Sequence, residues 1–170
     1  MVTRMSGGES AVLADGAFHE AMQRAGHLLA TRPRSEYELR TRLAGAGFEE
    51  VVVDRTVERL LELKLIDDAA FALQWVEERA RGRNRSPEIL IAELQAKGID
   101  RAAAEAALAA AGIDEEGQAR LVAGRLVSKV IERPLGEQGA ALMAMLVRRG
   151  FSEEAAEAGA RAVLPPEGWD

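Results

Sequence analysis

The chain has no cysteine among its 170 residues, so nothing indicates disulfide bonds or an oxidising compartment. Aromatic residues make up only 4% of the sequence, which leaves little surface for stacking single-stranded bases. No apolar run approaches the ~20 residues of a membrane span. The residues before Gly16 lack the hydrophobic region of a signal peptide. We therefore expect a soluble, cytoplasmic protein.

Catalytic and metal-binding patterns are also scarce. The only histidines, His19 and His27, lie about two helical turns apart without a carboxylate arranged as a partner. The stretch Gly45–Gly47 followed by Asp54 resembles only part of a dinucleotide-binding fingerprint, because the third glycine is missing. The pair Asp67-Asp68 is explained by helix capping, since adjacent residues point apart on a helix. We expect no catalytic, cofactor or metal site, and no enzymatic activity.

What the sequence does contain is a pattern that recurs three times: a leucine, three residues, a glycine and a bulky apolar residue. The copies are Leu43–Phe48, Leu94–Ile99 and Leu146–Phe151. The glycines lie 51 residues apart (47 to 98) and 52 residues apart (98 to 150). Each copy has a second leucine four residues earlier, at Leu39, Leu90 and Leu142. A spacing near 50 residues indicates a tandem array.

The glycine in each copy suits the end of a helix. Leucines four residues apart lie on one helix face, and a glycine at the C′ position adopts the left-handed conformation at little cost. The leucine at C3 and the apolar residue at C″ then make the hydrophobic contact of a Schellman motif. The sequence therefore predicts three equivalent helix ends.

Start signals divide each repeat into three helices. Ser35 begins a capping box with Glu38, Ser86 precedes a proline at N1, and Asp67 can cap a further helix. The predicted helices are 17–31, 35–46, 49–63, 68–82, 87–97, 101–111, 115–131, 136–149 and 153–163.

These helices define the predicted architecture. We predict an all-α protein built of three tandem three-helix repeats, each helix-turn-helix-like, in an elongated array. The repeats are expected at 17–64, 65–112 and 113–164, between a flexible N-terminal tail at 1–16 and a short frayed C-terminal tail at 165–170. We expect a monomer.

Charge is unevenly distributed along the chain. The formal net charge is −6, yet the junction between the first and second helices is basic in every repeat. In repeats one and three, cations that complement the helix dipole are the favoured explanation. The run from Arg79 to Arg85 is different, because four arginines in seven residues, with no acid among them, exceed what a helix end needs. We predict that this run binds an anionic surface.

The charge pattern leaves two classes of partner open. Screening at physiological salt acts over ~8 Å, so a local arginine cluster can attract phosphate despite the acidic total. The acidity of the whole chain nevertheless opposes long-range steering to DNA. A mixed-charge surface fits a protein partner, one already holding DNA, better than naked DNA.

Three stretches resemble the RecX family, the bacterial regulators of the recombinase RecA: Arg32–Leu43, Leu65–Ala72 and Arg79–Ile99. The end Arg148–Ser152 matches as well, so the resemblance covers about residues 17–163. It implies a fold of tandem three-helix repeats. It also implies inhibition of RecA by binding in the groove of the RecA–DNA filament, which damps ATP hydrolysis, strand exchange and co-protease function.

The leading hypothesis is therefore a non-enzymatic negative regulator of RecA, acting in recombination, DNA repair and the SOS response through the RecA filament. The alternatives are a helix-turn-helix-like DNA-binding module or a generic helical scaffold. Weak binding to single- or double-stranded DNA is compatible with a RecA regulator and with a DNA-binding module. The predicted partner-binding residues are Arg32, Arg34, Arg79, Arg81, Arg83, Arg85, Lys97, Arg125 and Lys129.

Overall fold

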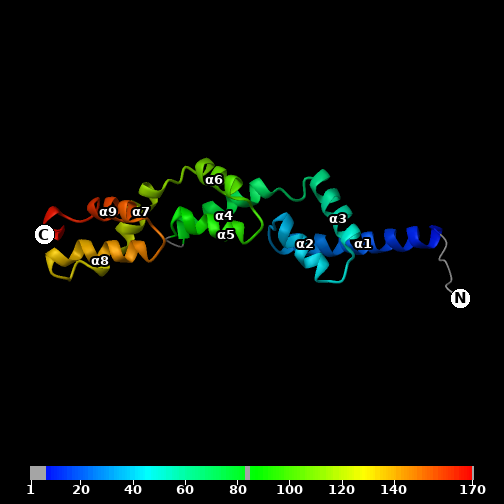
Figure 1. Ribbon diagram of the computed structural model, residues 1–170, viewed down its shortest axis with the longest axis horizontal. Helices are drawn as coiled ribbons and strands as arrows, with labels where there is room; N and C mark the ends of the chain where they lie inside the picture. The colour runs from blue at the N-terminus through cyan, green and yellow to red at the C-terminus, as the bar shows by residue number, and fades with distance from the viewer. Residues whose placement is uncertain (1–6, 83–84, 170) are drawn as a thin grey trace. The chain divides into compact units, whose positions relative to one another are not determined.

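The computed structural model describes residues 7–82 and 85–169, which form helices and turns without a strand (Figure 1). The α-helices are α1 (Gly7–Thr31), α2 (Glu36–Ala44), α3 (Glu50–Glu62), α4 (Asp68–Gly82), α5 (Pro87–Gln95), α6 (Arg101–Ala110), α7 (Glu115–Leu126), α8 (Leu135–Val147) and α9 (Glu153–Arg161). Two short 3₁₀ helices are η1 (Val127–Lys129) and η2 (Pro166–Trp169). The predicted all-α fold of three-helix repeats is confirmed.

Two predicted helix boundaries need correction. Helix α1 begins at Gly7, not at residue 17, so it includes most of the stretch predicted to be a flexible tail. The glycines there suggested a tail, but Ala11–Ala14 include good helix formers. Helix α7 ends at Leu126 and continues only as η1, whereas a helix to residue 131 was predicted.

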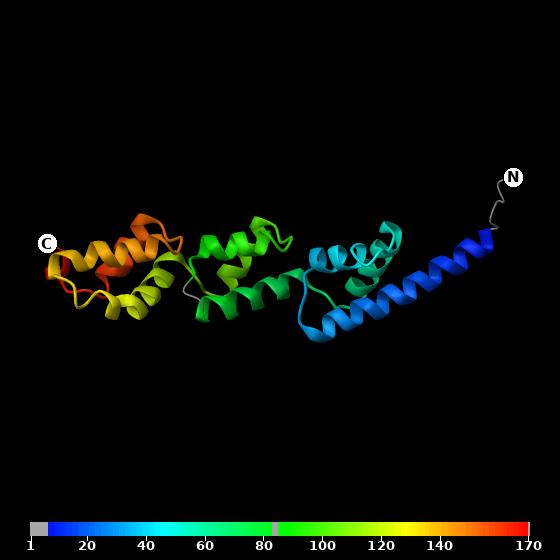
Figure 2. The same ribbon diagram turned by 90° about the horizontal axis from the view of Figure 1, so that it is seen from below.

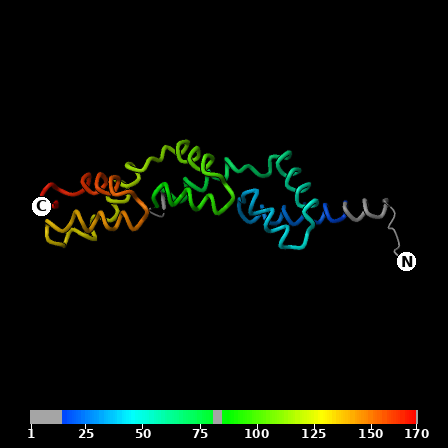
Figure 3. The backbone as a smooth tube through the Cα atoms, in the orientation of Figure 1, coloured from blue at the N-terminus to red at the C-terminus, as the bar shows by residue number. Residues whose placement is uncertain are grey.

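The chain divides into two compact units, each described here by itself. Unit 1 comprises the residues up to Phe71 together with Lys97–Ile99, and unit 2 comprises Ala72–Ala96 and the residues from Asp100 onward. The predicted elongated array concerns the placement of these units and stays a prediction. Figure 2 shows the helices of each unit from a second direction. Figure 3 shows the backbone as a smooth tube.

The leucines of the repeat pattern form the cores. In unit 1, Leu39 and Leu43 of α2 are fully buried against α1 and α3, where Val57 is also fully buried. In unit 2, Leu142 and Leu146 of α8 are fully buried in a cluster with residues of α7 and α9. Leucines four apart thus supply the buried face of the second helix in each case.

The predicted helix ends are present. Gly47, Gly98 and Gly150 have φ angles of +91°, +82° and +84°. The backbone N–H of Phe48 donates to the Leu43 carbonyl at 3.3 Å, and that of Phe151 donates to the Leu146 carbonyl at 3.4 Å. These are the bonds of a Schellman motif, and they confirm the prediction.

The C-terminal stretch 165–170 was predicted to be frayed, and this was wrong for the part that the structure describes. Leu164 and Gly168 are buried, and Trp169 packs against the apolar cluster of α7–α9. The guanidinium of Arg161 lies 4.4 Å from the centre of the Trp169 ring. A large aromatic side chain finds a place beside Gly139 of α8, where no side chain is in the way. This end is therefore part of the fold.

Candidate basic interface

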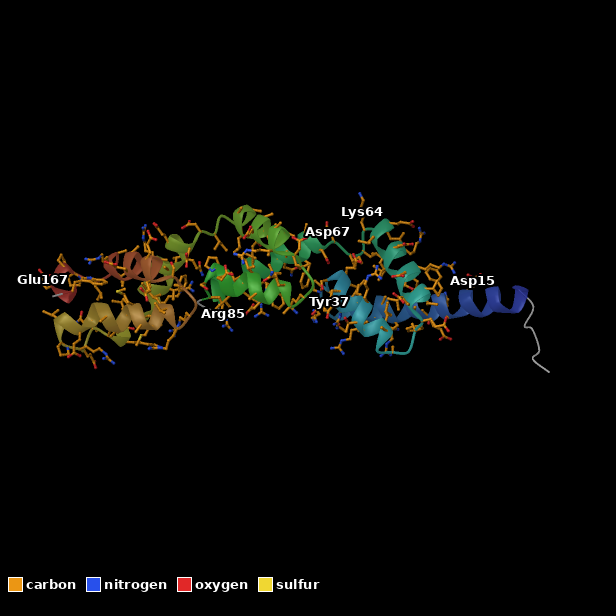
Figure 4. All side chains as sticks on the ribbon, in the orientation of Figure 1. Asp15, Tyr37, Lys64, Asp67, Arg85 and Glu167 are labelled. Carbon is orange, nitrogen blue, oxygen red and sulfur yellow. The ribbon has the colours of Figure 1, made fainter. Side chains whose placement is uncertain are left out.

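The predicted arginine run lies at the end of α4 and in the connection to α5, in unit 2. Arg79 and Arg81 belong to α4, and Arg85 directly precedes Ser86, the N-cap of α5 (Figure 4 labels Arg85). Arg83 lies outside the described residues. The Ser86 side chain accepts a hydrogen bond from the backbone N–H of Ile89, which fixes where the connection enters the helix.

Arg79 and Arg85 share one carboxylate with Trp75, and we call these residues with Glu93 the Glu93 cluster. The Trp75 Nε1–H donates to Glu93 Oε2 at 3.1 Å, and the Arg79 guanidinium lies 3.6 Å from the Trp75 ring centre. Glu93 Oε2 is 3.3 Å from Arg79 Nε, and Glu93 Oε1 is 3.5 Å from Arg85 Nε. One carboxylate therefore faces two guanidinium groups and leaves an excess of positive charge.

The two arginines differ in how they are held. The Arg79 side chain is only 19% exposed, because it stacks on Trp75 and pairs with Glu93. The Arg85 side chain is 40% exposed, while its Nε atom is buried and makes no hydrogen bond within the described residues. Arg79 is thus bound into the fold, whereas Arg85 is more loosely paired and partly exposed.

Two further predicted residues meet in unit 1, around Glu38; Arg32, Glu38 and Lys97 form the Glu38 cluster. Arg32 donates two hydrogen bonds to the Glu38 carboxylate, at 2.9 and 3.0 Å, and the Lys97 ammonium donates a third at 2.8 Å. Glu38 was predicted to complete a capping box with Ser35, but its carboxylate binds these cations instead.

The Glu38 cluster has a clear electrostatic signature. Partial burial alone would raise the pKa of Glu38, but the hydrogen bonds from Arg32 and Lys97 outweigh it and lower the pKa to about 2. Glu38 is therefore ionised at physiological pH, and it offsets one of the two positive charges beside it.

Arg34 lies at the end of α1 and complements its dipole, which is the role favoured from the sequence for the basic residues of repeat one. Its Nε–H donates to the Leu28 carbonyl at 3.1 Å, and Nη2 lies 3.4 Å from Thr31 Oγ1. Both acceptors belong to the last turn of α1, where carbonyls have no partner inside the helix. A cation in this place stabilises the helix end.

Arg125 and Lys129 lie in unit 2, on α7 and η1, and both are exposed. Arg125 lines an open pocket of about 310 Å³ together with Leu121, Glu77 of α4 and Asp114 at the start of α7. The acidic residues give this pocket a mixed charge. The binding of an anionic partner by Arg125 and Lys129 stays a prediction.

The sequence interpretation missed an apolar feature in unit 1. Leu61, Leu63 and Leu65, around the end of α3, are 42%, 44% and 56% exposed. Lys64, between the last two, has a φ of +53° and directs the chain out of the helix (Figure 4). Leu60 just before them is buried, and the alternating leucines that follow it in the sequence could have been noticed as residues without a core position. Such a group is typical of a protein contact.

In residues 7–82 and 85–169, no three His, Cys, Asp or Glu side chains are grouped so that they could hold a metal ion. No helix in this same part of the chain is both long and apolar enough to cross a membrane.

Comparison with known proteins identifies the family. The model described as "RecX, first three-helix domain" matches residues 21–60, and "RecX, second three-helix domain" matches residues 67–108. The regulatory protein RecX of Mycobacterium ulcerans is 41% identical over 133 residues, which cover 76% of each chain. That of Mycobacterium leprae is 37% identical over 128 residues, or 74% of this chain and 75% of that protein.

Solved structures agree on the fold. The crystal structure of RecX from Lactobacillus salivarius has a TM-score of 0.75 at 21% identity and covers 84% of this chain and 94% of that one. A second crystal structure, of a regulatory protein RecX, has a TM-score of 0.76 at 22% identity and covers 92% of this chain and 78% of that one. Together with the identity to the mycobacterial proteins, these matches lead to one conclusion: the chain belongs to the RecX family of regulatory proteins.

Proposed function

We propose that this chain is a non-enzymatic negative regulator of the RecA recombinase. It binds in the groove of the RecA–DNA filament and inhibits the ATPase, strand-exchange and co-protease activities of RecA. Family membership, established by 41% identity over most of the chain, is the observation that carries the proposal. The proposal also assigns the surface that contacts the filament.

The Glu93 cluster is the part of the candidate interface best suited to an anionic partner. Its two described guanidiniums share a single carboxylate, and the Arg85 side chain is loosely paired and 40% exposed. Arg81 and Arg83 add two positive charges to the same stretch of sequence. A filament offers phosphate and acidic protein groups together, so this region can bind it while the net charge of the chain stays negative.

The apolar residues of unit 1 favour a protein partner over bare nucleic acid. Exposed leucines at the end of α3 gain free energy when a partner covers them, at ~25 cal/mol per Å² of apolar surface. Protein–DNA interfaces are instead more polar and much more positively charged. The net charge of −6 also disfavours wide contact with DNA alone.

The test is RecA ATPase activity on single-stranded DNA, measured with increasing amounts of this protein. The variant changes Arg81, Arg83 and Arg85 to glutamate and keeps Arg79, because Arg79 stacks on Trp75 and pairs with Glu93. We expect inhibition to be lost while the helical circular dichroism is retained, since surface charges seldom change stability by more than ~0.5 kcal/mol each.

The matched control reverses an exposed arginine of the same unit. Arg101 of α6 is 52% exposed and pairs with Glu88 and Glu105, away from the arginine run in sequence. Arg101→Glu should inhibit RecA as the unmodified protein does. Full inhibition by the triple variant would refute the assignment of the interface.

Bare DNA separates the proposal from the DNA-binding alternative. If the three arginines mainly contacted phosphates of single-stranded DNA, the log–log salt slope of binding would be about −2, at ~−0.7 per contact. We expect binding to single- or double-stranded DNA to be weak without RecA. Tight binding with that steep salt dependence would favour a DNA-binding module instead.

A further inference from the structure

The repeats share a buried polar residue at one position of the second helix. Four residues before the first leucine of the pattern stand Ser35, Ser86 and Gln138. All three are buried, with exposed fractions of 0%, 0% and 3%. We call the start of the second helix, around this polar residue, its docking surface. In each repeat a different segment of the chain packs against it.

In unit 1, the segment on the docking surface is the turn Lys97–Ile99. The Ser35 hydroxyl donates to the Lys97 carbonyl at 2.7 Å. Gly98 approaches so closely that a Cβ built on it would lie 2.3 Å from the Cβ of Tyr37. Only a glycine turn fits in this position.

In unit 2, the docking surface of α5 holds the equivalent turn of the next repeat. A Cβ built on Gly150 would lie 2.8 Å from the Ser86 hydroxyl oxygen and 2.7 Å from Ile89 Cδ1. The same contact therefore occurs twice: the glycine turn that ends one second helix lies on the docking surface of the preceding repeat.

The docking surface of α8 is covered by the C-terminal end of the chain instead. A Cβ built on Gly139 would lie 2.8 Å from the Trp169 ring, and one built on Gly168 would lie 3.7 Å from Gln138 Oε1. Figures 1 and 2 both show the C-terminal end beside the first turns of α8. A glycine again faces the buried polar residue, so this segment takes the place that a following repeat would fill.

In unit 1, the first glycine turn has no such contact. Nothing lies within 4 Å of a Cβ built on Gly47, and Ala46 beside it is exposed. Ala46 stands where Lys97 and Arg149 stand in the other two turns. Among the second helices in the described part of the chain, the glycine turn after α2 is thus unoccupied, and the docking surface of α8 is covered by the C-terminal segment.

We propose that residues 165–169 act as an intramolecular cap, which prevents the Gly47 turn of a second copy of this chain from docking on α8. Such docking joins two different surfaces head to tail, so it can add molecules beyond a dimer, as a ring or as an open chain. The cap is held imperfectly, because the Trp169 Nε1–H is buried without an acceptor in the described residues. It is therefore displaceable, and its loss exposes the α8 surface.

Sedimentation velocity over a wide range of protein concentrations tests the cap. One variant ends at Leu164, and a second, Gly139→Ala, keeps the whole chain, favours helix α8 and displaces the Trp169 ring. The unmodified protein should stay monomeric. In both variants the average mass should rise with concentration beyond that of a dimer.

A substitution in the free turn identifies the contact. Gly47→Ala, added to either variant, should return it to a monomer, because a Cβ at the equivalent Gly98 and Gly150 would lie less than 3 Å from the docking surface. Gly112→Ala, at another glycine with a positive φ and nothing within 4 Å, should not. Association that survives Gly47→Ala would overturn the proposal, as would a monomeric Gly139→Ala variant. Should the shortened chain lose its helical circular dichroism, the Gly139→Ala result decides.

Discussion

The Glu38 cluster and the Glu93 cluster place the same charges together in different ways. Each sets one carboxylate of a second helix against two cations. Glu38 receives three hydrogen bonds between 2.8 and 3.0 Å, whereas the arginines of the Glu93 cluster stand 3.3 and 3.5 Å from their carboxylate. In the first, Lys97 joins residues far apart in the sequence. In the second, the pairing is looser, whereas the side chains of Arg32 and Arg85 are similarly exposed, at 44% and 40%.

This difference shows why a count of basic residues does not identify an interface. Lys97 ties the turn Lys97–Ile99 to α2 through Glu38, and Arg32 binds the same carboxylate. Arg85 is more loosely paired, and its charge is the one proposed to bind a partner. The same contrast provides three ways to test which cluster is structural.

The largest expected effect comes from a substitution that disturbs the Glu38 cluster without changing any charge. Gly98→Val should destabilise the protein by about 3 kcal/mol or more, because a left-handed φ strains valine and its Cβ collides with Tyr37. Gly47→Val meets only the strain, since no atom is near, and should cost about 1–3 kcal/mol. Thermal unfolding of both variants checks this; equal losses would contradict docking as the cause.

Removing each carboxylate in turn should give a smaller, unequal effect. Glu38→Gln leaves Arg32 and Lys97 close together with weaker acceptors, and we expect a loss of about 2 kcal/mol. Glu93→Gln should cost about 1 kcal/mol or less, because its ion pairs are longer. Urea unfolding at neutral pH measures both. A larger loss for Glu93→Gln would reverse the comparison.

The pH dependence of the Glu38 cluster provides a third test. The pKa of Glu38 falls from an ordinary 4.5 to about 2 in the folded protein, so the unfolded chain binds the proton more readily. This stabilisation is complete above pH 4.5 and is lost as the pH falls toward 2. After allowance for solvent screening it is on the order of 1–2 kcal/mol. The stability difference between the unmodified protein and Glu38→Gln should narrow over that range; a constant difference would exclude the linkage.

The repeats and their helix ends could be predicted from the sequence because the interactions that define them are local. A leucine pair four residues apart and a glycine at C′ act within one helix and one turn. Ser86 and Asp67 likewise cap helices through neighbours three residues away or fewer. The family could be identified for the same reason, since its motifs are continuous stretches.

What only the tertiary structure decided involves residues far apart in the chain. Glu38 meets Lys97 across 59 residues, and Trp169 finds a place beside Gly139, so neither contact could be read from spacing. The role of each arginine was undetermined for this reason: whether it is held or exposed depends on the carboxylate and ring that folding places next to it. Local geometry specifies helices and their ends, whereas the partner of a long side chain is fixed only when separate helices pack together.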